Sequence, residues 1–106
     1  MHTFALARRM AGTGISVNCL HPGVVATNLL PRWLRVIKPL FTRVMFDVER
    51  GARTSVYLAL DPSVAGLTGR YFDEYQVARA AAPLAKDYAL QESLWKMSSV
   101  WTGAAQ

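Results

Sequence analysis

VNCLHPGVVATNLL, residues 17–30, begins as an apolar segment and is then interrupted by Pro22 and Gly23. Proline lacks a backbone N–H and ends a strand, whereas glycine lets a ligand approach the main chain because it has no Cβ. In open parallel sheets, ligands bind beyond the carboxyl ends of the strands. The Pro-Gly step therefore marks a candidate ligand site, although an ordinary turn after a strand would explain the same two residues.

The residues before this step predict a helix and then a strand. Residues 3–11 are typical of the last turns of a helix with Phe4, Ala7 and Ala11 on one stripe, and either Gly12 or Gly14 would close it. Residues 15–20 carry apolar side chains on both faces. That pattern predicts a parallel strand covered by helices on both sides.

The residues after position 46 predict two more helices and a second strand. Asp47 is a suitable N-cap for a helix that runs to about Leu60. Residues 70–72 predict a short strand, residues 74–82 a loop, and Pro83 the first turn of the last helix. The apolar stripes expected to face the core consist of Ala52, Val56 and Ala59 in the first helix, and Leu90, Leu94, Met97 and Trp101 in the last. The order of elements predicts an α/β fold, one βαβ unit with flanking helices.

The length of the chain and its distribution of charged and apolar residues argue against several classes of protein. The 106 residues allow one domain at most, no apolar run reaches 18 residues, and the order of residues at the amino end is not that of a secretory signal. Residues 1–46 carry six arginines and lysines and no carboxylate, but they match no nucleic-acid-binding module, so we expect no nucleic-acid partner. Cys19 is the only cysteine, which favours a buried thiol in a reducing, intracellular compartment. His2 and His21 are too isolated in sequence to predict a metal site.

Four segments carry a resemblance to a known family. They are ARRMAGTGISVNCLHPGVVATNLL (7–30), ERGARTSVYLAL (49–60), TGRYF (68–72) and LWKMSSVWTG (94–103). Together they resemble the C-terminal part of a short-chain dehydrogenase/reductase, in particular its retinol dehydrogenase-like members. The resemblance implies that residues 1–106 are a C-terminal fragment of a single dinucleotide-binding oxidoreductase domain, an incomplete Rossmann-type doubly wound parallel sheet.

The resemblance also implies a cofactor site for NADP or NAD. Pro22 and Gly23 would lie against the nicotinamide ring, the main chain of Val25 would hold the carboxamide, and the Thr27 hydroxyl would hold the carboxamide or the pyrophosphate. The side chains of the apolar pair that follows Gly23 could then face inward, because the main chain is the ligand-binding part. Whether the cofactor is NAD or NADP stays open.

By the same resemblance, residues 29–46 would cover an apolar substrate such as a retinoid or a lipid aldehyde. The substrate-covering residues would be Trp33, Leu34, Ile37, Leu40 and Phe41. Ordinary packing of an amphipathic helix explains the same pattern, and peripheral membrane contact through Trp33 and the neighbouring cations Arg32, Arg35 and Lys38 is a further reading. Homo-oligomer formation stays open.

Parts of the family pattern do not occur in these 106 residues. There is no glycine-rich phosphate loop and no Tyr-x-x-x-Lys pair, and Tyr75, which has Arg79 four residues later, is discounted because arginine cannot lower a tyrosine pKa as lysine does. We therefore expect a member of an enzyme family whose 106 residues contain no catalytic residue. By themselves, these residues are expected to be inactive. The alternatives are a non-catalytic module that docks on a full-length relative through an unpaired strand edge, and a small basic surface-binding protein.

Overall fold

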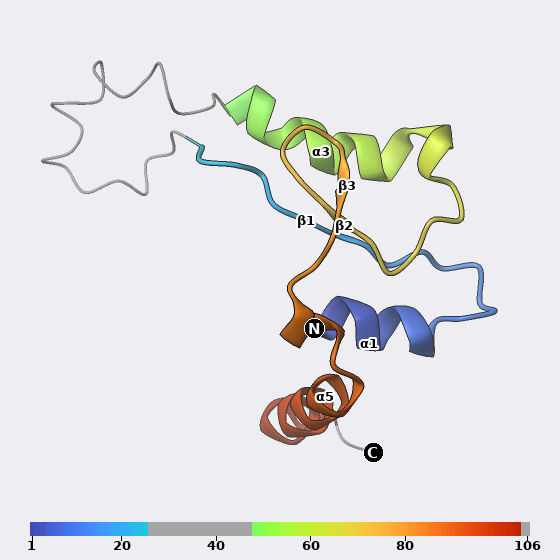
Figure 1. The fold of residues 1–106 in the computed structure, drawn as a ribbon. Helices are drawn as coiled ribbons and strands as arrows, with labels where there is room; N and C mark the ends of the chain where they lie inside the picture. The colour runs from blue at the N-terminus through green and yellow to red at the C-terminus, as the bar shows by residue number, and fades with distance from the viewer. Residues whose placement is uncertain (26–47, 105–106) are drawn as a thin grey trace, which may run out of the picture.

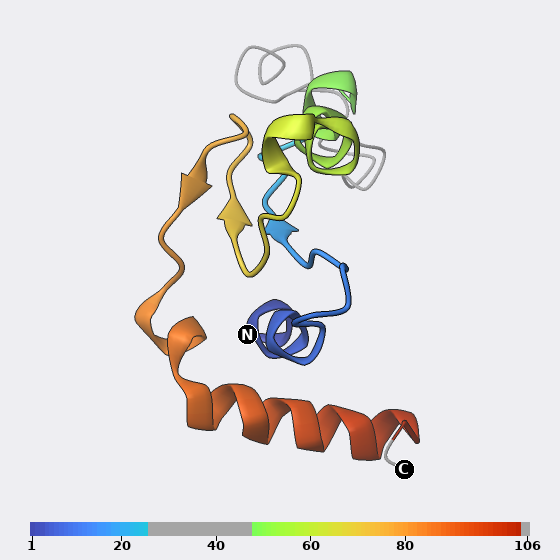
Figure 2. The same ribbon diagram turned by 90° about the vertical axis from the view of Figure 1, so that its right-hand side faces the viewer.

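The computed structural model of the chain describes residues 1–25 and 48–104, which form an α/β structure (Figure 1). In chain order the elements are α1 (His2–Arg9), β1 (Cys19–Leu20), α3 (Val48–Leu60), a 3-10 turn (Pro62–Val64), β2 (Tyr71–Phe72), β3 (Ala78–Arg79), α4 (Pro83–Lys86) and α5 (Tyr88–Thr102). Figure 2 shows that α3 covers one face of the sheet, α1 covers the other, and α5 lies below α1, on its side away from the sheet. None of the described helices combines the length and the apolar composition that crossing a bilayer requires.

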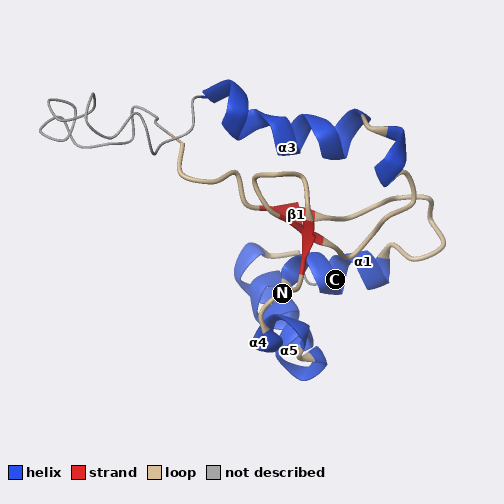
Figure 3. Ribbon diagram, turned by 45° about the horizontal axis from the view of Figure 1, so that its top comes forward, coloured by secondary structure: helices blue, strands red, loops and turns tan. Residues whose placement is uncertain are grey.

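The strands form one mixed sheet in the order β1-β2-β3. Figure 3 shows the strands in red between α3 and α1. β1 is parallel to β2, with Cys19 opposite Tyr71, and α3 lies in the connection between the two strands. β3 runs antiparallel to β2, with Tyr71 opposite Arg79. The predicted α/β class and its parallel pair are confirmed, and the sheet has a third strand that the sequence did not predict.

β1 is shorter and more exposed than the predicted strand over residues 15–20. Ile15 is 57% exposed, and Cys19, expected to be buried, is half-buried. Asn18 holds the segment before β1 in place, since its Nδ2 donates to the Leu67 carbonyl at 2.7 Å and its Oδ1 accepts from the Arg70 N–H at 3.0 Å. Within the described residues β1 pairs on one edge only, so it has no second neighbour to extend or bury it.

The prediction of a loop over residues 74–82 is wrong for Ala78 and Arg79, because the chain turns back there and forms β3, while the rest of the segment is turn or irregular. Asp73 organises the turn: its Oδ1 accepts from the Tyr75 N–H at 2.9 Å and from the Val77 N–H at 3.0 Å. Gln76 takes a left-handed conformation, with φ +62°. The turn therefore depends on side chain-to-backbone bonds, which carry little strand signal in the sequence.

α1 begins and ends slightly earlier than predicted. Its buried side chains are Ala5 and Ala7, whereas Ala11 lies beyond the helix and is exposed. Met10 is the C-cap residue, and Gly12 and Gly14 take left-handed conformations in the loop that follows. Arg8 and Arg9 occupy the last turn, where cations interact favourably with the helix dipole.

α3 ends at Leu60 as predicted but buries a different face. Its buried residues are Gly51 and Thr54, whereas the predicted stripe of Ala52, Val56 and Ala59 is exposed. The Thr54 hydroxyl donates to the Asp73 carbonyl at 3.1 Å. This bond to the end of β2 fixes which side of α3 faces the sheet.

The last helix is also divided and rotated relative to the prediction. Asp87 is extended between α4 and α5, and its Oδ1 accepts from the Leu90 N–H at 3.0 Å as the N-cap of α5. α5 directs Gln91, 3% exposed, toward α1. Three residues of the predicted stripe are exposed, Leu90 at 42%, Met97 at 46% and Trp101 at 73%, whereas Leu94 is half-buried. The prediction that this stripe forms the core is therefore wrong for Leu90, Met97 and Trp101.

Few described side chains are fully buried. The buried hydrophobic residues are Ala5, Ala7, Val64 and Phe72, of which Phe72 is the largest at 2% exposed. The Tyr57 ring of α3 lies edge-on to the Phe72 ring, with centroids 6.2 Å apart. The described core is thus a thin seam between α3, the sheet and α1.

Candidate functional site

The candidate site lies where β1 ends. The His21 N–H donates to the Phe72 carbonyl at 2.9 Å, so the ladder continues one residue past β1 before Pro22 interrupts it. Gly23 then takes a left-handed conformation, with φ +77°. Its N–H donates to Nδ1 of His21 at 3.0 Å, which closes a tight turn. Only glycine adopts this backbone conformation at little cost, so the turn explains why residue 23 is a glycine.

The carboxyl end of β2 lies beside this turn because β1 and β2 are parallel. It carries Asp73, whose Oδ2 accepts from Nε of Arg79 at 2.6 Å, and Glu74, whose Oε2 lies 4.0 Å from Nδ1 of His21. Burial raises the pKa of Asp73, but the Arg79 hydrogen bond and two backbone N–H bonds outweigh it and hold the pKa below the ordinary value. Asp73 is therefore an ionised group that holds a turn, a state unsuited to donating a proton at neutral pH.

Helix α3 covers the same edge and receives Val25. A Cβ built on Gly51 would lie 2.5 Å from Cγ2 of Val25, so the valine side chain occupies the space that glycine leaves in the helix. Val24, in contrast, is 63% exposed. The expectation that both apolar side chains after Gly23 face inward is thus correct for Val25 and wrong for Val24.

The predicted cofactor residues lie partly inside the described chain. Pro22 is exposed, Gly23 and Val25 are half-buried, and all three lie at the carboxyl edge of the parallel pair. Thr27 lies outside the described residues, as do all five predicted substrate-covering residues, Trp33, Leu34, Ile37, Leu40 and Phe41. In the described part of this edge, Gly23 contributes no side chain and the Val25 side chain packs against α3, whereas Pro22 and Val24 are exposed.

The described edge shows no assembled acid–base or metal chemistry. Arg79 pairs with Asp73, and Tyr75 is 55% exposed in the turn, an arrangement unlike a buried tyrosine with a lysine beside it. Within residues 1–25 and 48–104, no three histidine, cysteine or carboxylate side chains gather as a metal site would require.

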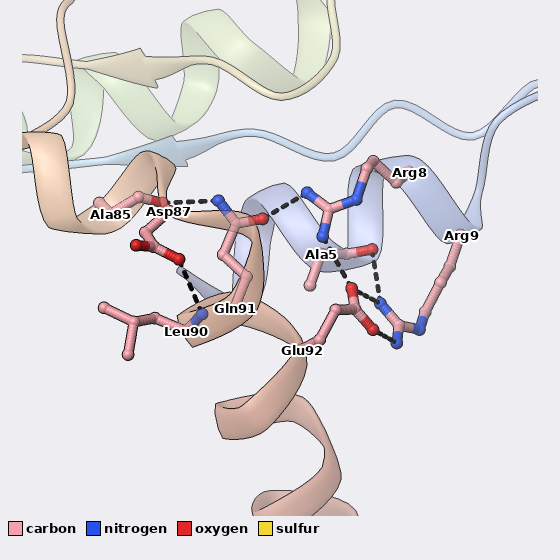
Figure 4. Close-up of polar contacts among 8 residues, drawn as sticks. All are labelled: Ala5, Arg8, Arg9, Ala85, Asp87, Leu90, Gln91 and Glu92. Atoms are coloured by element: carbon pink, nitrogen blue, oxygen red, sulfur yellow. Dashed lines mark hydrogen bonds and ion pairs between the residues drawn. The ribbon is translucent and has the colours of Figure 1, made fainter.

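A second polar cluster, which sequence reasoning missed, joins α1 to α5 (Figure 4). Nη2 of Arg9 donates to Oε2 of Glu92 at 2.6 Å, and Nη2 of Arg8 donates to Oε1 at 2.8 Å. Arg8 also donates to Oε1 of Gln91. The Arg9 and Arg8 hydrogen bonds lower the pKa of Glu92 to about 2. The only sequence signal for this cluster is the separation of charges along the chain, because residues 1–46 carry cations and no carboxylate.

Aromatic rings extend the same cluster. The Arg9 guanidinium lies 4.2 Å from the ring centroid of Trp95, and that of Arg8 lies 4.6 Å from Tyr88. His2 contacts Ser98, with Nε2 and Oγ 3.0 Å apart. The polar face of α5 is therefore the face that packs on α1.

Known proteins similar to this chain are dehydrogenases. Retinol dehydrogenase 14 of Homo sapiens is 41% identical over an alignment of 110 positions, which covers 97% of this chain and 32% of that protein. Short-chain dehydrogenase TIC 32 B, chloroplastic, of Brassica napus is 33% identical, covering 92% of this chain and 32% of the relative. Dehydrogenase/reductase SDR family member 13 of Bos taurus is 35% identical, covering 92% of this chain and 27% of the relative. The chain thus spans about a third of the length of the curated relatives it matches, and no family model and no solved structure matches it.

Proposed function

This chain is a homologue of retinol dehydrogenases and other short-chain dehydrogenase/reductases, and from that premise we propose that it is the C-terminal portion of an NAD(P)-dependent oxidoreductase. The proposed reaction interconverts an alcohol and a carbonyl. In this proposal residues 1–106 are a C-terminal fragment of one dinucleotide-binding domain. The mixed sheet with a helix on each face is compatible with the end of a doubly wound sheet.

The conformation of Gly23 is the observation that carries the proposal. A left-handed glycine just beyond the carboxyl end of a parallel strand places no side chain where ligands of such sheets bind, which supports a close approach of a ligand to the main chain. We assign Pro22 and Gly23 to the nicotinamide ring, the Val25 main chain to the carboxamide, and Thr27 to the carboxamide or pyrophosphate. When bound, NAD(P) carries the hydride that is exchanged with the substrate carbon.

The proposed substrate is apolar, a retinoid or another lipid alcohol or carbonyl. Relatives named as retinol dehydrogenases support this class, and we assign the cover of the substrate to Trp33, Leu34, Ile37, Leu40 and Phe41. The proposal assigns no catalytic residue to this chain, since the 106 residues contain neither a glycine-rich phosphate loop nor a Tyr-x-x-x-Lys pair. We expect no NAD(P)H-dependent reduction of retinal by the 106 residues alone, and turnover by the purified chain would contradict this.

A chimera tests the proposed cofactor turn. Residues 1–106 replace the matching third of human retinol dehydrogenase 14, and reduction of retinal is measured with NADPH and with NADH. We expect activity in the chimera, and a fall of kcat/KM of about ten-fold or more in Gly23→Ala because a Cβ enters the ligand edge. Gly12→Ala is the matched control: Gly12 has φ +78°, and a Cβ there meets nothing within 4 Å. Equal effects of the two substitutions would attribute the loss to backbone strain and reject the assignment.

The alternative function, a module that docks on a full-length relative, is favoured by the edge of β1. The N–H groups of Cys19 and His21 bond to β2, so the Leu20 N–H between them points to the other edge. Mixing the chain with full-length human retinol dehydrogenase 14 and measuring mass by light scattering tests this reading. Docking is supported if a one-to-one complex forms and Leu20→Pro abolishes it while the circular dichroism of the variant stays unchanged. If light scattering of the mixture gives only the masses of the two separate proteins, docking is rejected.

A further inference from the structure

Two adjoining hollows lie near the amino ends of the parallel strands, at the edge of the sheet opposite Gly23. Their volumes are about 350 and about 340 Å³, and Phe4, Gly69 and Lys86 line both. Gly69 directly precedes β2, Phe4 belongs to α1, and Lys86 ends α4. Figure 2 shows the chain from β3 to α4 passing beside α1, which brings these segments together.

The two hollows differ in chemistry. The first is lined on one side by Phe4 and Ala7, which offer an apolar wall. The second adds the side chains of Arg70 and Arg79. Small residues, Ala78, Ala80 and Ala81, complete the second hollow and leave its space open. No carboxylate lines either hollow.

Two cations at this place have no partner among the described residues. Arg8, at the rim of the first hollow, already bonds Gln91 and Glu92, and Arg79 bonds Asp73 through Nε. The Lys86 ammonium and the Arg70 guanidinium have no hydrogen bond or ion pair with any described side chain or backbone carbonyl. An excess of positive charge therefore remains beside an apolar wall.

We propose that the adjoining hollows bind a small amphipathic anion, an apolar body that carries one carboxylate or phosphate group. The anionic group lies between Lys86 and Arg70, where charge-assisted hydrogen bonds are the strong ones that protein side chains offer. The apolar body lies along Phe4 and Ala7. The volumes fall within the range of small-molecule pockets. The site does not depend on the proposed dehydrogenase function, since it shares no residue with the turn at 22–25.

Calorimetric titration of the 106-residue chain tests the proposal with four probes: decanoate, decyl phosphate, inorganic phosphate and decanol. We expect saturable one-site binding of decanoate, decyl phosphate or both, with inorganic phosphate and decanol each at least about ten-fold weaker, because each lacks one half of the recognised ligand. The two anionic probes distinguish a carboxylate from a phosphate as the preferred group. Absence of saturable binding by both anionic probes, or equal affinity for one of the two half-ligands, would overturn the proposal.

Variants locate the binding within the hollows. Lys86→Gln and Arg70→Gln each weaken binding by about ten-fold, the loss expected for one charge-assisted bond. Lys96→Gln removes the same charge from an exposed position of α5 outside both hollows and changes affinity by less than about two-fold. Ala80→Trp fills the second hollow without a change of charge and abolishes binding. If Lys86→Gln and Lys96→Gln weaken binding equally, the loss of affinity comes from the change in net charge, and the site is rejected. Circular dichroism verifies that each variant is folded.

Discussion

At the scale of single residues, Thr54 makes the contact that joins α3 to the sheet. It is 1% exposed, donates to the Asp73 carbonyl at 3.1 Å, and accepts from Nε2 of Gln76 at 2.9 Å. Valine has nearly the same shape but no hydroxyl, so a substitution would remove both of these hydrogen bonds. The Asp73 carbonyl would keep the bond from the Gln76 N–H at 3.2 Å, and Nε2 of Gln76 would keep its bond to the Glu74 carbonyl at 3.0 Å.

We therefore expect Thr54→Val to lower the free energy of unfolding by about 1–3 kcal/mol, measured by urea denaturation. Ser55→Ala removes a hydroxyl from the next, exposed residue of α3 and is the matched control, with a change within about 0.5 kcal/mol. Equal losses in the two variants would show that the bond to Asp73 does not stabilise the fold.

At the scale of elements, Asp87 decides where α5 begins. It is extended, with φ −65° and ψ 116°, and its side chain caps the Leu90 N–H. We expect Asp87→Ala to cost about 0.5–2 kcal/mol of stability, while Asp87→Ser or Asp87→Asn retains most of it because both keep a capping oxygen. Thermal denaturation followed by circular dichroism compares the three variants, and a loss in Asn or Ser as large as in Ala would argue against the cap.

The exposed face of α5 leads to a prediction opposite to the one its sequence pattern suggests. Because Met97 is 46% and Trp101 73% exposed, we expect Met97→Gln and Trp101→Gln to change the free energy of unfolding of this chain by less than about 0.5 kcal/mol each. Phe72→Ala, at 2% exposed, costs about 3–5 kcal/mol. Losses of a similar size for Trp101→Gln and Phe72→Ala in urea denaturation would place the tryptophan in the core instead.

At the scale of the whole molecule, Glu92 makes the stability of the α1–α5 contact depend on pH. Its pKa is about 2 in the folded chain, against an ordinary 4.5, because Arg9 and Arg8 bond to its carboxylate. A lowered pKa contributes stability that is fully present above about pH 4.5 and is lost as the pH falls toward about 2. Asp73, whose pKa is also below its ordinary value, adds a dependence of the same sign.

We expect the free energy of unfolding to fall as the pH is lowered from about 4.5 to 2. Glu92→Gln should make the slope of this free energy against pH smaller without removing it. Glu49→Gln, at an exposed position of α3 outside the cluster of Arg8, Arg9 and Glu92, keeps the slope of the unchanged chain. Urea denaturation at several pH values measures the slopes, and identical slopes for Glu92→Gln and the unchanged chain would exclude the cluster as the source.

Part of the fold follows from local patterns and was predicted from them. The end of α3 at Leu60, the strand at residues 71–72, and the interruption at Pro22 and Gly23 each depend on residues close in sequence. β3 was missed because Asp73 side-chain bonds shape its turn, and Ala78 and Arg79 carry no strand preference. The roles of Pro22, Gly23, Val25 and Thr27 toward a cofactor stay predictions.

The sequence by itself determined the α/β class, the parallel pair and the resemblance to short-chain dehydrogenase/reductases, because backbone preferences and short motifs act over a few residues. Only the tertiary structure decided which helix faces are buried and which cations find carboxylates. Glu92 meets Arg9 across 83 residues, and α5 directs Gln91 toward α1 while Leu90, Met97 and Trp101 of its apolar stripe stay exposed. Helical periodicity in the sequence indicates that the two faces of a helix differ in polarity, but the packing of the whole chain decides which neighbour each face contacts.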